Sequence, residues 1–393
     1  MAKPEIRLKG FEGEWKNAQL DACVIFLDNL RKPVKEGSRI KGIYPYYGAS
    51  GIVDYINEYI FDEELILLSE DGANITDRNY PVCFLATGKF WVNNHAHVLK
   101  AKNGFINSFL SNAMERKNYT QYNTGMAMPK LNKEVCKNIP LAFPSVEEQQ
   151  LIANYFKSLY SMIQGVTKKI TSLKQMKQAC LVSMFPQEGE TMPRVRFKGF
   201  KGEWLNVELS ECLSVCKDRN LSETYGKGDV LSVSDDYGVV NQIELLGRSY
   251  AGKSVANYRI LRNGHIVYTK SPLKVKPFGI IKVNNGSDGI VSTLYAVYVP
   301  MDWVSAKFIN YYFEPSFRMN KYIHPLVNKG AKNDMKVSDE NVLKGNIFIP
   351  KEKEEQEKIA TYFTSLDKQI SLQEARLEKL KQIKSACLDK MFV

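Results

Sequence analysis

Apolar residues recur along two stretches of the chain at alternating intervals of four and three positions, the pattern of a helix that packs along a narrow seam. The stretches cover residues 159–184 and 366–391. Each carries a lysine at the same level, and a polar seam residue commonly fixes the register of paired helices. The seam positions are Leu159, Ile163, Val166, Ile170, Leu173, Lys177, Cys180 and Met184 in the first stretch, and Leu366, Ile370, the polar Gln373, Leu377, Leu380, Lys384, Cys387 and Met391 in the second.

Two long helices that pair with each other explain this pattern best, because the seams are equally long and carry their lysines at matching levels. Each helix could instead pack only on its own domain. Ahead of the first seam, Ser145 and Glu148 have the S-x-x-E spacing of a capping box, which predicts a helix start. A short amphipathic helix with an apolar face from Leu151 to Phe156 is expected to follow it.

The chain also contains two copies of one unit, since several motifs return in the same order. Motifs at both ends of the unit match closely, whereas most of the interior does not. Shared ends with different interiors predict a common scaffold that presents two different surfaces. The matching pairs are "RLKGFEGEW" (7–15) with "RFKGFKGEW" (196–204), "FINSFL" (from Phe105) with "FINYYF" (from Phe308), "EQQLIANYF" (from Glu148) with "EQEKIATYF" (from Glu355), and "LKQMKQACLVSMF" (from Leu173) with "LKQIKSACLDKMF" (from Leu380).

The predicted fold class is α+β, with two mixed α/β domains joined by two long antiparallel helices that form a coiled-coil spacer, and a pseudo-two-fold internal repeat. A stretch with two prolines, a glycine and little apolar content marks a linker between the copies. The expected boundaries are 1–144 for the first α/β domain, 145–185 for the first helical region, 186–195 for the linker, 196–350 for the second α/β domain and 351–393 for the second helical region.

Charge points to a polyanionic partner. The 393 residues carry a formal net charge of +11, and an excess of this size favours nucleic acid. A membrane surface is the other possibility, but no basic amphipathic anchor supports it. The sequence has no apolar run of spanning length, and its opening residues have no apolar h-region, so we expect neither a spanning helix nor a secretory leader. The seven scattered cysteines suit reduced thiols. We therefore expect a cytoplasmic protein that does not bind membranes.

Catalytic motifs are scarce. "GRSYAGKS" (247–254) satisfies the G-x-x-x-x-G-K-S pattern of a phosphate-binding loop, which needs a preceding strand and a helix that begins at Lys253. The preceding "IELL" could supply the strand, but the following residues predict a hairpin around Asn263-Gly264. His95 and His97 would share one face of a strand, yet no third metal ligand is suggested nearby. We expect no catalytic residues, no metal and no cofactor bound by this chain.

Side chains suited to DNA are plentiful in both interiors. Lys and Arg can neutralise phosphates, while Asn, Ser and Arg can read base edges. The candidates are Tyr46, Tyr47, Ser50, Lys89, Asn93, Asn94 and Lys130 in the first copy, and Lys217, Arg219, Arg248, Lys253, Tyr268, Lys270, Ser271, Lys274, Lys276, Lys329 and Lys332 in the second.

These motifs together resemble one family, the specificity subunits of type I restriction–modification systems. The resemblance covers essentially the whole chain and rests on "YPYYGASG", "DGANI", "WVNNHAHVL", "PKLNKEVCKNIPLAFPSVEEQQLIANYF" and "EEQEKIATYF". The second copy departs from the pattern, because it lacks P-K-L and has one extra residue before its Glu-Gln pair.

The resemblance implies a non-catalytic subunit that reads a bipartite, asymmetric sequence in double-stranded DNA. Each interior would be a target recognition domain, and the paired helices would set the length of the unread spacer. Two methylation subunits would dock on the helices and supply S-adenosylmethionine chemistry. Restriction subunits with a motor would add ATP and Mg²⁺. The rival hypotheses are a stand-alone two-domain DNA-binding regulator, a structural coiled-coil adaptor and a nucleotide-binding protein built on the Gly247 loop.

Overall fold

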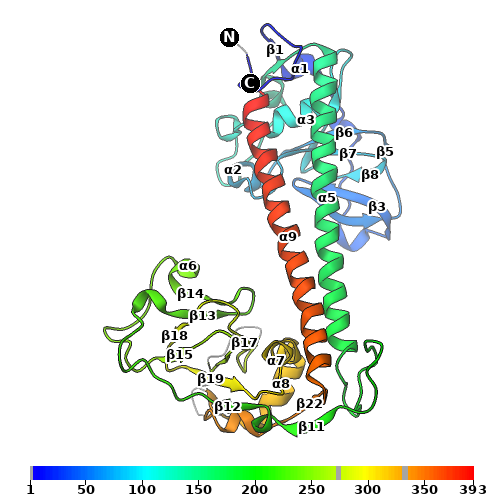
Figure 1. Cartoon of the computed structure of the whole chain (residues 1–393). Coiled ribbons are helices and arrows are strands. Elements are labelled where there is room, and N and C mark those ends of the chain that lie inside the picture. The colour runs from blue at the N-terminus through cyan, green and yellow to red at the C-terminus, as the bar shows by residue number, and fades with distance from the viewer. Residues whose placement is uncertain (1–2, 271–275, 330–334) are drawn as a thin grey trace. The chain divides into compact units, whose positions relative to one another are not determined.

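The chain folds into two compact units, and each unit is described by itself. The computed structural model describes residues 3–270, 276–329 and 335–393 (Figure 1). Unit 1 consists of Met1–Lys168 with Glu374–Val393, and unit 2 consists of Lys169–Gln373. Both expected helical regions, 145–185 and 351–393, are therefore divided between the two units.

Unit 1 contains two four-stranded sheets and one two-stranded sheet. Their strand orders are β2-β9-β6-β7, β4-β3-β8-β5 and β1-β10. The strands are β1 (Lys16–Gln19), β2 (Val24–Phe26), β3 (Lys41–Gly48), β4 (Gly51–Ile56), β5 (Phe61–Asp62), β6 (Leu65–Ser69), β7 (Cys83–Ala86), β8 (Lys89–Val92), β9 (Ala96–Ala101) and β10 (Pro140–Phe143). The short helices are α1 (Leu20–Cys23), α2 (Asn74–Asp77), α3 (Asn107–Glu115) and α4 (Lys133–Lys137).

Unit 2 keeps part of this plan and replaces the rest. Its four-stranded sheet has the order β12-β19-β16-β17, and the two-stranded pairs are β11-β22, β13-β14, β15-β18 and β20-β21. The strands are β11 (Leu205–Glu208), β12 (Leu213–Val215), β13 (Leu231–Ser234), β14 (Gly238–Asn241), β15 (Arg259–Leu261), β16 (Ile266–Thr269), β17 (Ile281–Val283), β18 (Gly289–Val291), β19 (Tyr295–Pro300), β20 (Asn328–Lys329), β21 (Met335–Lys336) and β22 (Asn346–Ile349). The helices are α6 (Gln242–Leu246), α7 (Ala306–Phe313) and α8 (Ser316–Ile323).

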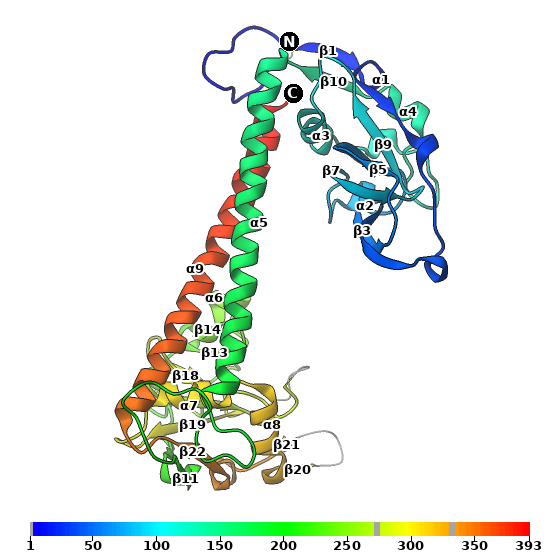
Figure 2. The same cartoon turned by 90° about the vertical axis from the view of Figure 1, so that its right-hand side faces the viewer.

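The two long helices are α5 (Val146–Ser183) and α9 (Lys353–Met391), which lie alongside each other (Figure 2). The short amphipathic segment expected before the first seam is the beginning of α5 rather than a separate helix. Every seam position is buried or half-buried. In unit 1 the hydroxyl of Tyr155 lies 3.3 Å from the sulfur of Cys387, and in unit 2 Cys180 lies 3.4 Å from Tyr362. The contact residue in α9 moves from 387 to 362 as the residue in α5 moves from 155 to 180, so the helices run antiparallel.

Seam residues also belong to the domain cores. In unit 2, Leu173 of α5 and Leu366 and Ile370 of α9 join one hydrophobic cluster with the buried faces of α7 and the four-stranded sheet. In unit 1, Ile152 and Phe156 of α5 join a cluster with Leu388 and Met391 of α9. Mutual pairing and packing on the domain therefore occur together.

The repeated motifs at the copy ends form one frame in each unit. Arg7 binds both carboxylate oxygens of Glu148 at 2.8 Å, and Arg196 binds those of Glu355 at 2.7 and 2.8 Å. Half of the expected capping box is present, since the Glu148 N–H lies 3.3 Å from the Ser145 hydroxyl. The prediction that the Glu148 carboxylate accepts the backbone N–H of Ser145 is wrong, because this carboxylate binds Arg7 instead.

Aromatic rings complete the frame, and they show that the chain copies are interleaved. Phe392 packs against Trp15 and Phe109 in unit 1, with ring centroids 6.4 and 5.4 Å apart. Its counterpart Phe185 packs against Trp204 and Phe308 in unit 2, at 6.1 and 5.4 Å. Each unit thus takes its last aromatic anchor from the other copy.

The alignment of "FINSFL" with "FINYYF" is wrong by one helical turn. It pairs Phe105 with Phe308, but Phe105 lies before α3 and packs on Phe143 instead. The true counterpart of Phe308 is Phe109, since both contact the tryptophan of their own frame. A shift of four residues preserves the apolar face of a helix, so identical letters matched in the wrong register.

Within the described residues, no helix is both long and apolar enough to cross a bilayer.

Candidate nucleic-acid interface

Four loops of unit 1 meet beside the ends of β3, β6 and β8. The hydroxyl of Ser69 donates to the carbonyl of Ala49 in the β3–β4 turn. The N–H of Asn93 donates to the Tyr47 carbonyl at 3.0 Å, and the N–H of Glu70 donates to the carbonyl of His95 at 2.9 Å. The fourth loop contains Leu131. Its N–H donates to the carbonyl of Glu70 at 2.7 Å.

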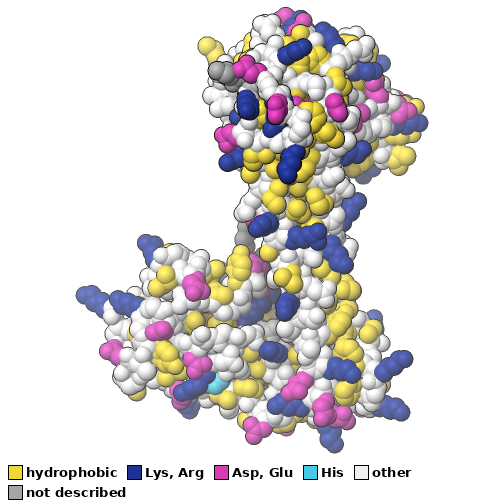
Figure 3. All heavy atoms as spheres, turned by 45° about the horizontal axis from the view of Figure 1, so that its top comes forward, with side chains coloured by type: hydrophobic (Ala, Val, Ile, Leu, Met, Phe, Trp, Pro, Cys, Tyr) yellow, Lys and Arg dark blue, Asp and Glu magenta, His cyan; other side chains and the backbone are white. Residues whose placement is uncertain are grey.

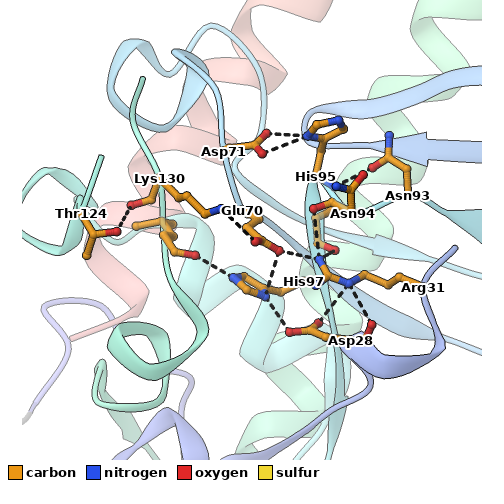
Figure 4. A network of polar contacts seen from close by, with 12 residues as sticks. Asp28, Arg31, Glu70, Asp71, Asn93, Asn94, His95, His97, Thr124 and Lys130 are labelled. Carbon is orange, nitrogen blue, oxygen red and sulfur yellow. Dashed lines mark hydrogen bonds and ion pairs between the residues drawn. The ribbon is translucent and has the colours of Figure 1, made fainter. Parts of the chain in front are cut away.

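A buried charge network holds these loops together (Figure 4). The ring of His97 is 2% exposed, and its Nδ1 lies 2.8 Å from a carboxylate oxygen of Asp28. Its Nε2 lies 2.8 Å from the carbonyl oxygen of Leu131. Arg31 adds a contact of 2.6 Å to Glu70. Because both ring nitrogens of His97 face acceptors only, both must donate, and the ring is an imidazolium.

This geometry explains the titration of His97. Burial alone would lower its pKa, but the hydrogen bond and charge of Asp28, with a further contribution from Cys136, outweigh burial and raise the pKa to about 10. Burial would raise the pKa of Asp28, yet the hydrogen bond from His97 lowers it below the ordinary value. The pair is therefore charged on both sides at neutral pH.

The network presents a short polar turn to solvent. The side-chain oxygen of Asn93 accepts the N–H of His95 at 2.8 Å, which closes the turn around the exposed Asn94. The ring of His95 lies 2.9 Å from Asp71, whose backbone forms a bridge with Lys130. An exposed amide, an imidazole and a lysine next to one another can contact base edges and phosphates.

Some predicted residues of unit 1 fit this surface and others do not. Tyr47, Ser50, Asn94 and Lys130 are exposed or half-exposed at the loop end. Lys89 is exposed at the opposite end of β8, with its Nζ 4.7 Å from the centroid of the Tyr59 ring.

The predictions for Tyr46 and Asn93 as DNA contacts are wrong, because these side chains are 1% and 7% exposed. Tyr46 is structural: its hydroxyl accepts the N–H of Val34 at 2.9 Å, and Arg39 covers its ring. Asn93 shapes the turn rather than touching a ligand. The sequence of a strand motif does not show which of its aromatic and amide side chains point into the core.

The hairpin β3–β4 exposes apolar side chains that the sequence reasoning missed. Ile43 is 79% exposed, Val53 57% and Tyr55 50%. Alternation along β3 and β4 was a possible signal, but a register shift between Lys41 and Tyr44 obscures it.

In unit 2, two loops lie side by side and carry exposed cations. The N–H of Asn220 donates to Tyr258 at 3.0 Å, and the buried Asn220 amide also accepts the N–H of Tyr225 at 3.1 Å. Ser254 lies 3.1 Å from Glu223 across the two loops. The predicted DNA contacts that are exposed on or beside these loops are Lys217, Arg219, Arg248 and Lys253.

Other candidates of unit 2 are neutralised or buried. The prediction for Tyr268 is wrong, because the ring is 0% exposed and its hydroxyl donates to the carbonyl of Phe278. The prediction for Lys276 is wrong as well, since its 7% exposed side chain binds Asp235 at 2.7 Å. Lys270 is half-buried and pairs with Asp339 at 2.5 Å.

Four further candidates fall on parts of the chain where side chains are not described. Ser271, Lys274 and Lys332 lie outside the described residues, and for Lys329 only the backbone in β20 is described.

The phosphate-loop pattern has the wrong architecture around it. The "IELL" residues belong to helix α6, which is capped by Gly247, so a helix and not a strand lies directly before the loop. No helix begins at Lys253, because strand β15 follows at Arg259. The expected hairpin around Gly264 is also wrong: β15 pairs with β18, whereas β16 pairs with β17 and β19. The turn at Gly264, with φ of 81°, joins two different sheets.

A metal site finds little support in unit 1. Both ring nitrogens of His97 are occupied by protein acceptors. Across residues 3–270, 276–329 and 335–393, no group of three or more His, Cys, Asp or Glu side chains is arranged to hold an ion. The arrangement offers exposed cations and amides that suit a polyanion.

The face of the molecule shown in Figure 3 carries side chains of both charges. On the face shown in Figure 3, Lys and Arg side chains alternate with Asp and Glu side chains. Recognition by such a surface depends on the geometry of particular loops more than on net charge.

Comparisons with known proteins agree on one family. The model of the type I restriction modification DNA specificity domain matches residues 12–175 and 204–382. A putative type I restriction enzyme specificity subunit of Haemophilus influenzae is 37% identical over 155 residues, which are 39% of each chain. A putative type I specificity subunit of Mycoplasma pneumoniae is 30% identical over 165 residues, which cover 41% of this chain and 43% of the relative. The aligned parts thus span less than half the length of these two relatives.

The fold has been seen before. The crystal structure of a type I restriction–modification S subunit from M. genitalium superposes with a TM-score of 0.67 over 99% of both chains. Its sequence identity is 12%, so this likeness concerns the fold alone. The family match covers both copies, in agreement with the duplicated frame.

Proposed function

The chain belongs to the family of type I restriction–modification DNA specificity domains, and from this premise we propose that it is the DNA-reading subunit of a type I restriction–modification complex. Unit 1 and unit 2 would each read one half of a split, asymmetric sequence in double-stranded DNA. The chain itself would be non-catalytic and would position partner enzymes on the DNA.

The observation that carries this proposal is one frame with two different reading surfaces. The pairs Arg7–Glu148 and Arg196–Glu355 have the same geometry in the two units. The exposed loops differ, with a histidine and amide turn held by the His97 network in unit 1 and two cationic loops ordered by Asn220 in unit 2. Equal frames with unequal loops suit a bipartite target whose halves differ.

The partners would supply the chemistry. Two methylation subunits docked along α5 and α9 would bring S-adenosylmethionine, and restriction subunits would bring ATP and Mg²⁺. All seven cysteines are free thiols, which suits the reducing cytoplasm in which genomic DNA is found.

Co-expression with the methylation subunits tests the proposal. Genome-wide adenine methylation should then mark one split motif. Asn94→Ala should relax or abolish recognition at one half of the motif, and Arg219→Ala should do so at the other half. A good contact to a base contributes about 1–3 kcal/mol of discrimination. Loss of both halves in each variant, with the fold intact, would contradict the assignment of one half-site to each unit.

The rival of a stand-alone regulator is tested in the same system. The purified chain alone should bind DNA weakly, with an affinity that falls steeply as salt rises. Specific binding of equal strength with and without the methylation subunits would favour the regulator.

A further inference from the structure

A cavity of about 680 Å³ lies within unit 1, along one face of α5. Its opposite walls come from β7 and α3, and its lining follows α5 from Gln150 to Gln164. At a rise of about 1.5 Å per residue, this is a groove of roughly 21 Å. Phe84 and Ile106 make part of the wall apolar, while Gln150, Asn154 and Gln164 are exposed amides at the rim.

A lysine without a direct ion pair among the described residues lines this groove. The Nζ of Lys384 lies 4.8 Å from the centroid of the Tyr160 ring. Among the described residues, no carboxylate lies within 4.0 Å of this ammonium group. Burial lowers the pKa of Lys384, and the charge of Glu115, which also lines the cavity, offsets this only in part. The Glu115 carboxylate accepts the N–H groups of Val82 and Cys83 at 2.9 Å and pairs with Arg78 at 3.3 Å.

The equivalent lysine of unit 2 is fully paired, which makes the unpaired state of Lys384 informative. Lys177 binds Glu314 at 2.5 Å and Asp367 at 2.6 Å. By the repeat spacing of 207 residues, Tyr160 occupies the position of Asp367. Unit 1 has therefore replaced one of the two carboxylates by a phenol ring.

The neighbouring hydrogen bond is exchanged in the same way. In unit 2 the hydroxyl of Tyr311 donates to Asp367 at 2.9 Å. In unit 1 the hydroxyl of Tyr160 donates to the side-chain oxygen of Asn112 at 3.0 Å. Asn112 thus takes the place of Tyr311, and the amide brings no charge. A half-buried ammonium group next to an open groove favours an anionic occupant.

We propose that this groove of unit 1 receives an acidic segment of a methylation subunit, with an Asp or Glu carboxylate of that segment paired with Lys384. The inference rests on the proposed function and adds a site to it. Unit 2 would not offer the same contact, because Lys177 already has two carboxylates. The two methylation subunits would then be held in different ways.

The shape of the groove favours a polypeptide over a small acid. Its lining extends along about four turns of α5, and exposed amides at the rim can bond to the backbone of an extended or helical segment. A small carboxylate would need only the part near Lys384.

Binding of the full-length chain to the methylation subunits tests the role of Lys384. Lys384→Met retains the alkyl stem and removes the charge, and it should weaken binding by about tenfold or more. Lys9→Met is the matched control, since Lys9 is an exposed cation of unit 1 outside both long helices and outside the groove lining, and it should bind like the wild type.

A second variant tests the comparison between the units. Tyr160→Asp with Asn112→Tyr reproduces the unit 2 arrangement and gives Lys384 an internal carboxylate. It should weaken binding even where Lys384→Met folds poorly. Wild-type affinity in both variants would overturn the proposal.

Photo-crosslinking locates the occupant. A benzophenone side chain at Asn154 should label a methylation-subunit peptide that contains Asp or Glu, and the same group at the equivalent Thr361 of unit 2 should not label that peptide. Labelling at Thr361 alone would overturn the site. If free acetate or glutamate competed as well as the subunit, the groove would be a small-acid site and the proposal would fail.

The outcomes also separate this inference from the proposed function. If the wild-type chain binds the subunits and directs methylation, and Lys384→Met binds them equally well, only the proposal for the groove fails. If the wild-type chain binds no methylation subunit, both the groove proposal and the proposed function fail.

Discussion

The hydroxyl of Tyr155 lies 3.3 Å from the sulfur of Cys387, in a contact between α5 and α9. The counterpart contact in unit 2 joins Cys180 and Tyr362 at 3.4 Å, with the residue types exchanged between the helices. Tyr155 and Tyr362 are 207 positions apart, as are Cys180 and Cys387. The same pair of residue types therefore occurs once in each unit, with the two helices exchanged.

This interleaving predicts that an anchor in one copy stabilises the unit built around the other copy. Phe392→Ala removes a ring from the Trp15 cluster and should destabilise unit 1 by about 3–5 kcal/mol. Phe185→Ala should do the same to unit 2. Hydrogen exchange of α3 and α7 distinguishes the two results, because each helix reports on its own unit. Equal effects on both helices in both variants would contradict the prediction.

The Arg7–Glu148 pair should be essential to the frame of unit 1. The carboxylate side chain of Glu148 is 1% exposed, so Arg7→Met leaves a buried charge without its partner. We expect a loss of about 3–5 kcal/mol in the free energy of unfolding. Arg7→Met combined with Glu148→Gln should recover part of the loss, since no charge is then left buried. Chemical denaturation of the single and double variants measures this coupling.

Unit 1 should lose stability in alkaline solution through His97. The folded pKa of about 10 lies above the unfolded value of 6.5, so the folded state binds the extra proton more tightly. The stabilisation is complete below pH 6.5 and is lost as pH rises towards 10, at about 1.4 kcal/mol for each tenfold difference in proton affinity.

His97→Gln should flatten this pH dependence. Free energies of unfolding between pH 6 and 10 provide the measurement. A wild-type chain whose stability does not change over this range would show that His97 is neutral in the folded state.

The sequence predicted the parts of the fold that repeat. Three features recur with the same residue types, because the same contacts are made twice. They are the seam spacing, the Glu-Gln pairs that begin at Glu148 and Glu355, and the motifs at 7–15 and 196–204. Inward and outward directions within the variable strands were not predictable. Tyr46 and Tyr47 are adjacent, yet one is 1% exposed and the other is half-buried at the loop end.

Long-range pairing was equally hidden from the sequence. The local sequence of residues 259–269 predicts a hairpin. In the structure β15 pairs with β18 and β16 pairs with β19, so the two strands belong to different sheets. Glu148 has the local spacing of a capping residue, but Arg7, far away in the sequence, takes its carboxylate. In both places a tertiary contact outweighs a local signal.

Lys253→Ala should weaken DNA binding without affecting nucleotide chemistry. The lysine is exposed on a loop that follows a helix instead of preceding one. We expect a uniform loss of affinity across DNA sequences and a salt dependence reduced by about one charge. ATP-dependent activity of the assembled complex, measured at saturating DNA, should stay at the wild-type level. Loss of that activity with DNA binding intact would revive the phosphate-loop hypothesis.

The paired helices should set the spacer between the two half-sites. The boundary between the units falls after Lys168 in α5 and after Gln373 in α9, and Lys168 is exposed there. Because the helices are paired, both must be lengthened to keep their seams in register. Four residues inserted at each place add about 6 Å. With base pairs about 3.4 Å apart, this corresponds to nearly two base pairs.

The expected methylated motif keeps both half-sites and has a wider spacer. Four residues turn a helix by roughly 40° beyond one full turn, so the apolar faces stay nearly aligned, whereas two residues turn it by about 200° and should destabilise the pair. The same four residues placed after Gly189, in the linker between the copies, are the control and should leave the spacer unchanged. Altered half-sites with a constant spacer would contradict the model, because a longer helix pair could then not be what measures the distance.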